Sequence, residues 1–158
     1  MRGIFIDPFT RMVTEIDLPE KGDSVDIVAL ISMMNCNTFD VARLTLADEE
    51  IDCYVDDNGL FVQDQAFFII AGRPLAGKAI LLGRTDWWEC VPPRATLETV
   101  CGAVQWANRR YAQAAIEMQT RAAMAHAVAH GAHVESNGPY GFISTPSAID
   151  PDRDAKEG

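Results

Sequence analysis

Near its N-terminus the chain has two short runs rich in apolar residues, each of strand length, with a turn sequence between them. Residues 4–6 and 12–16 are predicted as two strands, and residues 7–10 (Asp-Pro-Phe-Thr) have the composition of a turn. Residues 24–35 then change to helical spacing, with Ser24 as a candidate N-cap. The pattern predicts a hairpin followed by one short helix.

A second antiparallel hairpin is predicted from residues 39–46 and 50–56, which flank a turn at residues 47–49. The second strand alternates cleanly, so its apolar and polar side chains lie on opposite faces. The apolar set is Ile51, Cys53 and Val55, and the polar set is Glu50, Asp52, Tyr54 and Asp56. We expect one face to be buried and the other to be a solvated acidic strip that is available to a partner.

Residues 66–71 and 79–82 are continuously apolar, which is typical of strands covered on both faces in the middle of a sheet. Residues 72–77 between them are rich in glycine and proline and predict a loop. With Lys78 this loop matches the GxxxxGK part of a P-loop, but Ala79 and a strand-like run follow where the motif needs Ser or Thr and a helix. The segment is therefore interpreted as a strand–turn–strand connection.

Helical spacing resumes at the candidate N-cap Thr96, and few helix-breaking residues occur before Gly131. An unbroken helix over residues 95–130 would be about 54 Å long at ~1.5 Å per residue, longer than so small a domain. The helix therefore bends or splits near Gly102, or its alanine-rich second half pairs with another chain. Of these we favour a homo-oligomer contact.

These patterns predict an α+β fold with a mixed or mostly antiparallel sheet, one short helix and a long C-terminal helix. Residues 1–93 form the expected sheet domain, and residues 94–131 form the long helix, which packs on that domain or on a partner subunit. Residues 132–158 are rich in Gly, Pro, Ser and Asp and predict an irregular tail.

The chain of 158 residues is acidic, with a formal net charge of −10. Most of the excess lies in residues 1–93, with 16 acidic and 7 basic side chains, so we expect no direct nucleic-acid binding. No apolar run approaches the ~20 residues that cross a bilayer, and no signal-peptide pattern opens the chain. We expect a cytoplasmic protein without membrane contact, whose four scattered cysteines are reduced.

The sequence contains no complete catalytic motif. Residues 1–93 contain no histidine, and no GxSxG motif occurs, which argues against nucleophile–histidine catalysis. Paired carboxylates lie in predicted turns and on the exposed strand face, where they stay solvated. The sequence therefore favours a non-catalytic protein over an enzyme without excluding the enzyme, and we expect no cofactor.

One alternative to that expectation is a transition-metal site. His126, His130 and His133 are spaced four and three residues apart, so a continuing helix would place them on one face, as zinc, nickel or copper require. Gly131 is expected to end the helix between the second and third histidines, and the helix dipole also favours histidine at a C-terminus.

Two further groups are candidate binding residues. The adjacent Trp87 and Trp88 cannot share one side of a strand, so one of them is a candidate for exposure on a partner-binding surface. The alternative, which is the more common outcome for tryptophan, is core packing with Trp106 against the long helix. Arg73, Lys78 and Arg84 are the candidate ligand-binding residues; a pocket joining one of them to an aromatic residue would favour a phosphorylated ligand.

Four segments carry a resemblance: Ile-Asp-Pro at 6–8, Val-Thr-Glu-Ile at 13–16, Tyr-Val-Asp-Asp-Asn-Gly-Leu at 54–60, and residues 68–83. On these segments residues 3–106 resemble a family of short proteins of unknown function encoded by phages, plasmids and bacterial genomes. The resemblance implies an accessory protein of a mobile genetic element, in one version countering a host defence system.

The leading hypothesis is a non-catalytic, homo-oligomeric binding protein whose partner is a host protein or a small molecule. The alternatives are a ligand-binding or enzymatic protein with a cleft between subunits, and a histidine-rich metal-binding protein.

Overall fold

The computed structural model describes residues 1–130, 133–135 and 142–144. By their internal contacts the chain divides into two compact units, Met1–Ala112 and Gln113–Gly158, which are described separately. The fold is α+β with antiparallel sheets and a long C-terminal helix, as the sequence predicts.

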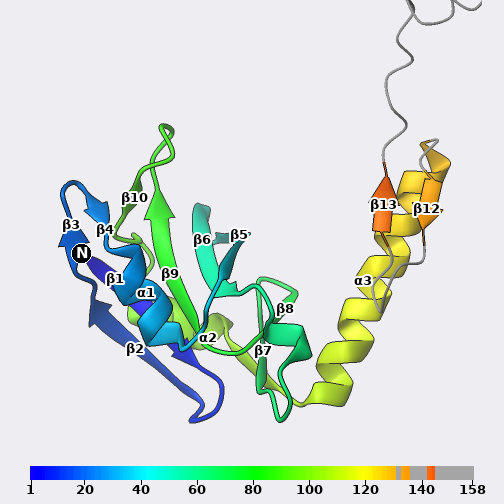
Figure 1. The fold of residues 1–158 in the computed structure, drawn as a ribbon, viewed down its shortest axis with the longest axis horizontal. Helices are drawn as coiled ribbons and strands as arrows, with labels where there is room; N and C mark the ends of the chain where they lie inside the picture. The colour runs from blue at the N-terminus through cyan, green and yellow to red at the C-terminus, as the bar shows by residue number, and fades with distance from the viewer. Residues whose placement is uncertain (131–132, 136–141, 145–158) are drawn as a thin grey trace, which may run out of the picture. The chain divides into compact units, whose positions relative to one another are not determined.

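Six strands of the first unit form one antiparallel sheet in the order β2-β1-β9-β6-β5, with β10 also paired to β9 (Figure 1). These strands are β1 Arg2–Asp7, β2 Met12–Asp17, β5 Phe39–Leu46, β6 Glu49–Asp56, β9 Ala79–Arg84 and β10 Cys90–Val91. The pairing of β1 with β2 and of β5 with β6 confirms both predicted hairpins. The second turn is tighter than predicted, because Ala47 and Asp48 alone form it, with φ values of 48° and 61°.

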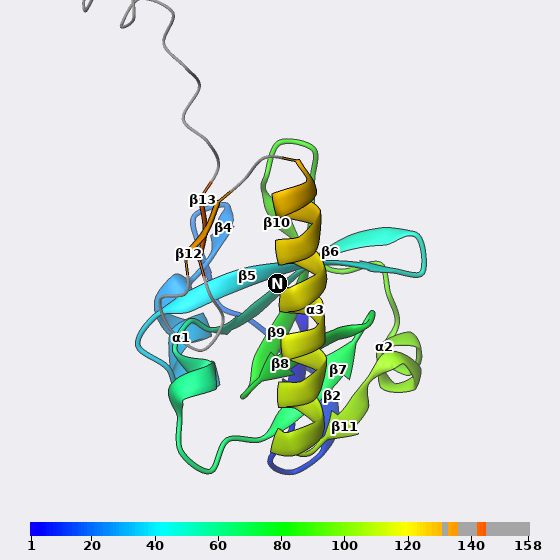
Figure 2. The ribbon, with the colours of Figure 1, turned by 90° about the vertical axis from the view of Figure 1, so that its right-hand side faces the viewer.

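Three other strands of this unit form a smaller sheet in the order β11 Gln105–Ala107, β7 Phe67–Ile70 and β8 Arg73–Ala76 (Figure 2). The predicted loop at residues 72–77 is therefore wrong, since most of it is β8. An edge strand tolerates Pro74, which lies opposite Ile69. A further short hairpin pairs β3 Glu20–Lys21 with β4 Ser24–Val25.

The first helix, α1 Ile27–Met34, begins slightly later than predicted. Its N-cap is Asp26, whose carboxylate accepts a hydrogen bond from the N–H of Val28 at 3.0 Å, whereas the predicted cap Ser24 lies in β4. A short 3₁₀ helix, η1 Gly59–Phe61, follows β6.

The single helix predicted over residues 95–130 is wrong, because the segment divides into α2 Leu97–Ala103, β11 and α3 Arg109–Ala129. Val104 leaves the helical conformation with φ −78° and ψ 129°, and Trp106 then pairs with Phe68 of β7. The pairing with β7 supplies the backbone hydrogen bonds that a helix would otherwise have made here. Val104 and Trp106 also pack against the main hydrophobic core, and this burial stabilises the strand further. The first unit consequently extends to Ala112 rather than ending at residue 93.

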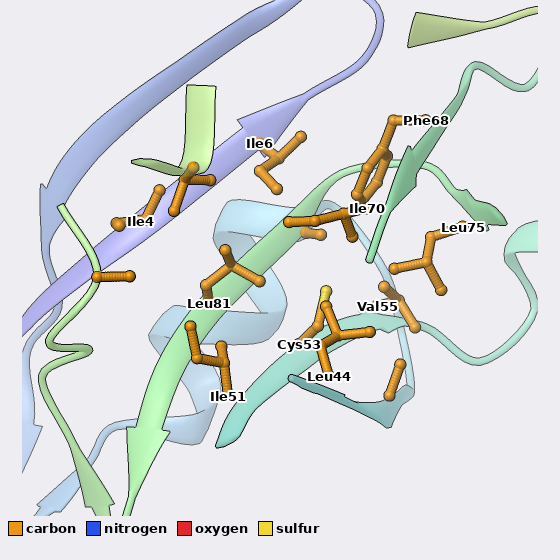
Figure 3. Packing of buried hydrophobic residues seen from close by; sticks show 14 residues of the cluster. Ile4, Ile6, Leu44, Ile51, Cys53, Val55, Phe68, Ile70, Leu75 and Leu81 are labelled. Carbon is orange, nitrogen blue, oxygen red and sulfur yellow. The ribbon is translucent and has the colours of Figure 1, made fainter. Parts of the chain in front are cut away.

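The larger sheet is covered on both faces. On one face Leu81 of β9 packs with Phe68 of the smaller sheet and Val100 of α2 (Figure 3). On the other face Ile80 of β9 packs with Leu30 of α1, which lies in front of the sheet in Figure 1. β9 therefore contributes to both clusters, which confirms the prediction of a strand covered on both faces.

The second unit contains the rest of α3 and two short strands, β12 His133–Glu135 and β13 Phe142–Ser144, which pair antiparallel. The irregular tail predicted for residues 132–158 is therefore wrong where these strands occur, and its other residues lie outside the described part of the chain. The described helices include none with both the length and the apolar character to traverse a bilayer.

A buried carboxylate attaches the segment before α2 to the β5–β6 turn. Glu49 is 7% exposed, and its two oxygens accept hydrogen bonds from the N–H groups of Arg94 and Ala95, each at 2.8 Å. The next residue, Thr96, caps α2 by accepting a hydrogen bond from the N–H of Thr99 at 3.1 Å, as the sequence predicts. Glu49 therefore positions the start of α2 over the core.

We predict that Glu49→Ala lowers the free energy of unfolding by about 2–3 kcal/mol, because it leaves two backbone N–H groups without an acceptor. Urea denaturation followed by circular dichroism measures the change. The control is the exposed Glu89, for which Glu89→Ala should stay within about 0.5 kcal/mol of the wild type. Equal stability of the two variants would contradict the role assigned to Glu49.

Candidate functional site

The candidate site lies on the α1 face of the larger sheet, at the end where β9 leaves the core. In the β5–β6 register Arg43 lies opposite Asp52, and Glu50 lies two positions from Asp52 on the same strand. Arg84 is the last residue of neighbouring β9. Because side chains alternate along a strand, these four residues project on the same face as Ile80.

Arg84 joins the two acidic residues. Its Nη2 lies 2.7 Å from the Glu50 carboxylate, and its Nη1 lies 3.5 Å from Asp52. The Arg84 and Asp52 side chains are only 12% and 13% exposed, whereas Glu50 is 75% exposed. The Arg84–Asp52 pair is thus largely removed from water, which makes each partner dependent on the other.

Trp88 stacks on both arginines. The Cζ atoms of Arg43 and Arg84 lie 4.4 Å and 4.5 Å from the centroid of its ring, which is cation–π geometry. Trp88 has a φ of 68°, in the left-handed region that bulky side chains rarely adopt. Its N–H donates to the carbonyl of Thr85 at 3.0 Å within the loop. The arginines and the loop together hold the ring in place.

Trp87 precedes Trp88 in the same loop. The loop at residues 85–89 joins β9 to β10 and projects beyond the sheet (Figure 1). On it Trp87 is 85% exposed and Trp88 63% exposed. We call the following set the tryptophan cluster: Arg43, Glu50, Asp52, Arg84, Trp87 and Trp88.

Beneath the cluster the face becomes apolar. The Tyr54 hydroxyl lies 3.1 Å from the Cys90 sulfur, and the Tyr54 ring packs against Phe39 with centroids 5.5 Å apart. Burial raises the pKa of the Tyr54 phenol, and the hydrogen bond to Cys90 raises it further. On the opposite face burial raises the pKa of the Cys53 thiol to about 12. Both groups stay protonated at neutral pH, so neither is an activated nucleophile or base.

The solvated acidic strip predicted on β6 is wrong at two of its four positions. Taken as whole residues, Asp52 and Tyr54 are 9% and 7% exposed. Arg84 pairs with Asp52, and Tyr54 belongs to the buried cluster that includes Leu30 of α1. Glu50 is exposed as predicted, and Asp56 lies half-buried near the opposite end of the strand. Alternation along one strand identifies a face, but it cannot show that a second layer covers that face.

The structure brings together residues that the sequence placed in separate groups. Glu50, Asp52 and Trp88, predicted to bind a partner, surround Arg84, predicted to bind a ligand. Arg73, of β8, is outside the cluster, although its side chain donates to the backbone carbonyl of the cluster residue Arg43 at 3.2 Å.

Both tryptophans are exposed, where one was expected, because they lie in a loop and not on a strand. Packing of the pair with Trp106 is excluded, since Trp106 lies in β11 and pairs with Phe68. Sequence reasoning also missed Arg43. Its position opposite Asp52 follows from the two-residue turn, which the sequence predicted one residue too long.

Lys78 immediately precedes β9, at the end of the strand opposite Arg84. The Gly77 N–H donates to the carbonyl of Ala66 at 2.8 Å, and a strand, not a helix, follows Lys78 directly, so the segment is not a P-loop. The predicted turn between two strands is itself mostly the strand β8. Lys78 lines a cavity of about 410 Å³ together with the aromatic Phe9.

The three histidines do not share one helical face. His126 and His130 stack with ring centroids 4.2 Å apart, and His130 Nδ1 lies 2.7 Å from the His126 carbonyl. The helix ends at Ala129, and His133 lies in β12 beyond residues outside the described part of the chain. Among the residues whose side chains the structure describes, no group of three or more His, Cys, Asp or Glu is placed to hold a metal ion.

Comparison with protein-family models, with curated proteins and with solved structures found no match to the chain.

We predict that Arg84→Met lowers the free energy of unfolding by about 3 kcal/mol, because Asp52 then stays buried without a cation. Urea denaturation measures the loss, and adding Asp52→Asn should restore part of it. The matched control is Arg94→Met: the Arg94 side chain is 79% exposed, so its removal should change stability by less than about 1 kcal/mol. If Arg84→Met is as stable as Arg94→Met, the buried ion pair does not organise this site.

Proposed function

We propose that the chain is a non-catalytic binding protein that engages a partner protein through the tryptophan cluster. The observation that carries the proposal is the exposure of Trp87 and Trp88, at 85% and 63%, side by side on one projecting loop. Tryptophan and arginine are the residues most enriched at the energetic centres of protein interfaces. A water-exposed pair of indoles offers a large apolar area for a partner to cover.

The support beneath Trp88 favours binding without rearrangement. Arg43 and Arg84 hold its ring, and the Glu50 and Asp52 carboxylates in turn hold Arg84. A ring that is already ordered loses little conformational entropy when a partner covers it. Trp88 therefore serves as a fixed platform, and Trp87 as the side chain that enters the partner's pocket.

The negative charge of the chain, and of the residues beside the two tryptophans, limits which kinds of partner can bind. Asp86 and Glu89 flank the two tryptophans, and the whole chain carries −10. A phosphate backbone would be repelled, so the partner is a protein with an apolar pocket and a basic rim. We extend the proposal to a wider role, in which the chain is an accessory protein of a mobile element and acts in the cytoplasm against a host defence system. That extension is supported by the resemblance of residues 3–106 alone.

The test compares the full chain with two alanine variants of exposed aromatic residues. Trp87→Ala should lose a captured protein from a lysate of the source organism, whereas Phe61→Ala, which removes a 70% exposed ring outside the cluster, should retain it. The captured protein is then purified and titrated. Trp87→Ala should weaken its binding at least ~30-fold, as expected for a central interface residue. Identical capture and affinity for all three proteins would refute the proposal.

Self-association through α3 is a second part of the proposal. One side of α3 in the second unit exposes apolar side chains at helical spacing. They are Ala114, Met118, Ala122, Ala125 and Ala129. Small residues at this spacing permit close approach of two helices, and Met118, 71% exposed, is the largest apolar side chain among them.

We predict that Met118→Glu converts a dimer into a monomer in analytical ultracentrifugation, because it places a charge at the centre of the helix contact. Ala123→Glu introduces the same charge on the opposite side of α3, at another exposed position, and should leave the dimer unchanged. A wild-type chain that sediments as a monomer at high concentration would rule out this contact.

A further inference from the structure

The cavity beside Lys78 lies at the opposite end of β9 from the tryptophan cluster. Six residues separate Lys78 from Arg84, or about 20 Å along a strand. The cavity measures about 410 Å³, within the range of small-molecule sites, and all of its lining residues belong to the first unit. A site here is therefore independent of the proposed protein-binding surface.

Strand register places three charged residues side by side at this cavity. Ala79 pairs with Ile6 of β1 and with Val55 of β6. One position further along each strand, Lys78 lies between Asp7 and Asp56, and all three line the cavity. A basic residue is thus positioned between two acidic ones by backbone pairing.

The Lys78 ammonium nevertheless has no partner among the described residues. In the part of the chain that the structure describes, no hydrogen bond or ion pair engages it, although its side chain is half-buried. Each neighbouring carboxylate is fixed instead by its own turn. Asp7 accepts from the N–H of Phe9 at 2.9 Å, and Asp56 accepts from the N–H of Asn58 at 2.9 Å. The cavity that these three residues line is therefore open to a ligand that carries charges of both signs.

Other residues that line the cavity indicate which further groups a ligand would carry. Helix α1 ends here at Met34, and the C-terminal end of a helix carries partial negative charge. Phe9 and Val62, 53% and 40% exposed, provide apolar surface. The cavity therefore combines two carboxylates and a helix C-terminus, one ammonium, and an apolar wall.

We propose that this cavity binds a small zwitterion of the α-amino acid class with an apolar side chain. Its ammonium group would contact Asp7 and Asp56, its carboxylate Lys78, and its side chain Phe9 and Val62. The two carboxylates disfavour a phosphate, and Lys78 disfavours a simple amine, whereas a zwitterion satisfies both signs of charge.

The first arm of the test varies the ligand and uses the unmodified full chain. The standard L-amino acids are screened by isothermal titration calorimetry, and L-leucine is compared with isoamylamine, which lacks the carboxylate, and 4-methylpentanoate, which lacks the amine. An apolar amino acid should bind, with both single-charge analogues at least ~10-fold weaker, because each loses a charge-assisted contact. Absence of binding by every amino acid below about 10 mM, or tighter binding of inorganic phosphate, would overturn the proposal.

The second arm varies the protein. Lys78→Gln and Asp56→Asn should each weaken the best amino acid at least ~10-fold, and Asn retains the oxygen that accepts from Asn58. Lys21→Gln removes an exposed lysine from β3 and should not change binding. Trp87→Ala should also bind normally, so that this proposal and the protein-binding proposal fail separately. Unchanged affinity in a folded Lys78→Gln variant would overturn the site.

Discussion

The burial of β9 on both faces is the constraint on which the first unit depends. Its side chains alternate between the core shared with the smaller sheet and the core under α1, and its backbone pairs with β1 and β6 on either edge. A charge in the middle of such a strand would lose its hydration without a partner. Charged side chains consequently flank the strand, Lys78 immediately before it and Arg84 at its last position.

The two ends differ in how their charges are satisfied. Arg84 is engaged by Glu50 and Asp52 and lies against Trp88, so its end is a closed, preorganised cluster beneath a projecting loop. Lys78 faces an open cavity whose carboxylates are bound to their own turns. The same strand thus has two exposed tryptophans at one end and a cavity lined by charged residues at the other. We propose a different partner for each end, a protein for the first and a small molecule for the second.

Several parts of the site were accessible to sequence reasoning. The period of two in residues 50–56 and the continuous apolar run at 79–82 are local properties of strands, and the structure confirms both strands. The sequence could not predict that Arg84 lies near Glu50. This proximity requires β6 and β9 to be neighbours in the sheet, whereas η1 and the whole β7–β8 hairpin separate them along the chain. Exposure of Trp87 depended likewise on a loop that propensity alone does not distinguish from a strand.

The sequence by itself determined the β1–β2 and β5–β6 hairpins, the helix α1 and the central position of β9, because these follow from hydrophobic periodicity and turn residues. Only the tertiary structure decided that residues 95–130 divide into two helices and a strand, since Trp106 gains a β7 ladder and a place against the core that no helix would give it. It also decided that Asp52 and Tyr54 are buried. Covering a sheet face requires a second layer from elsewhere in the chain, and a single strand's pattern carries no record of that layer.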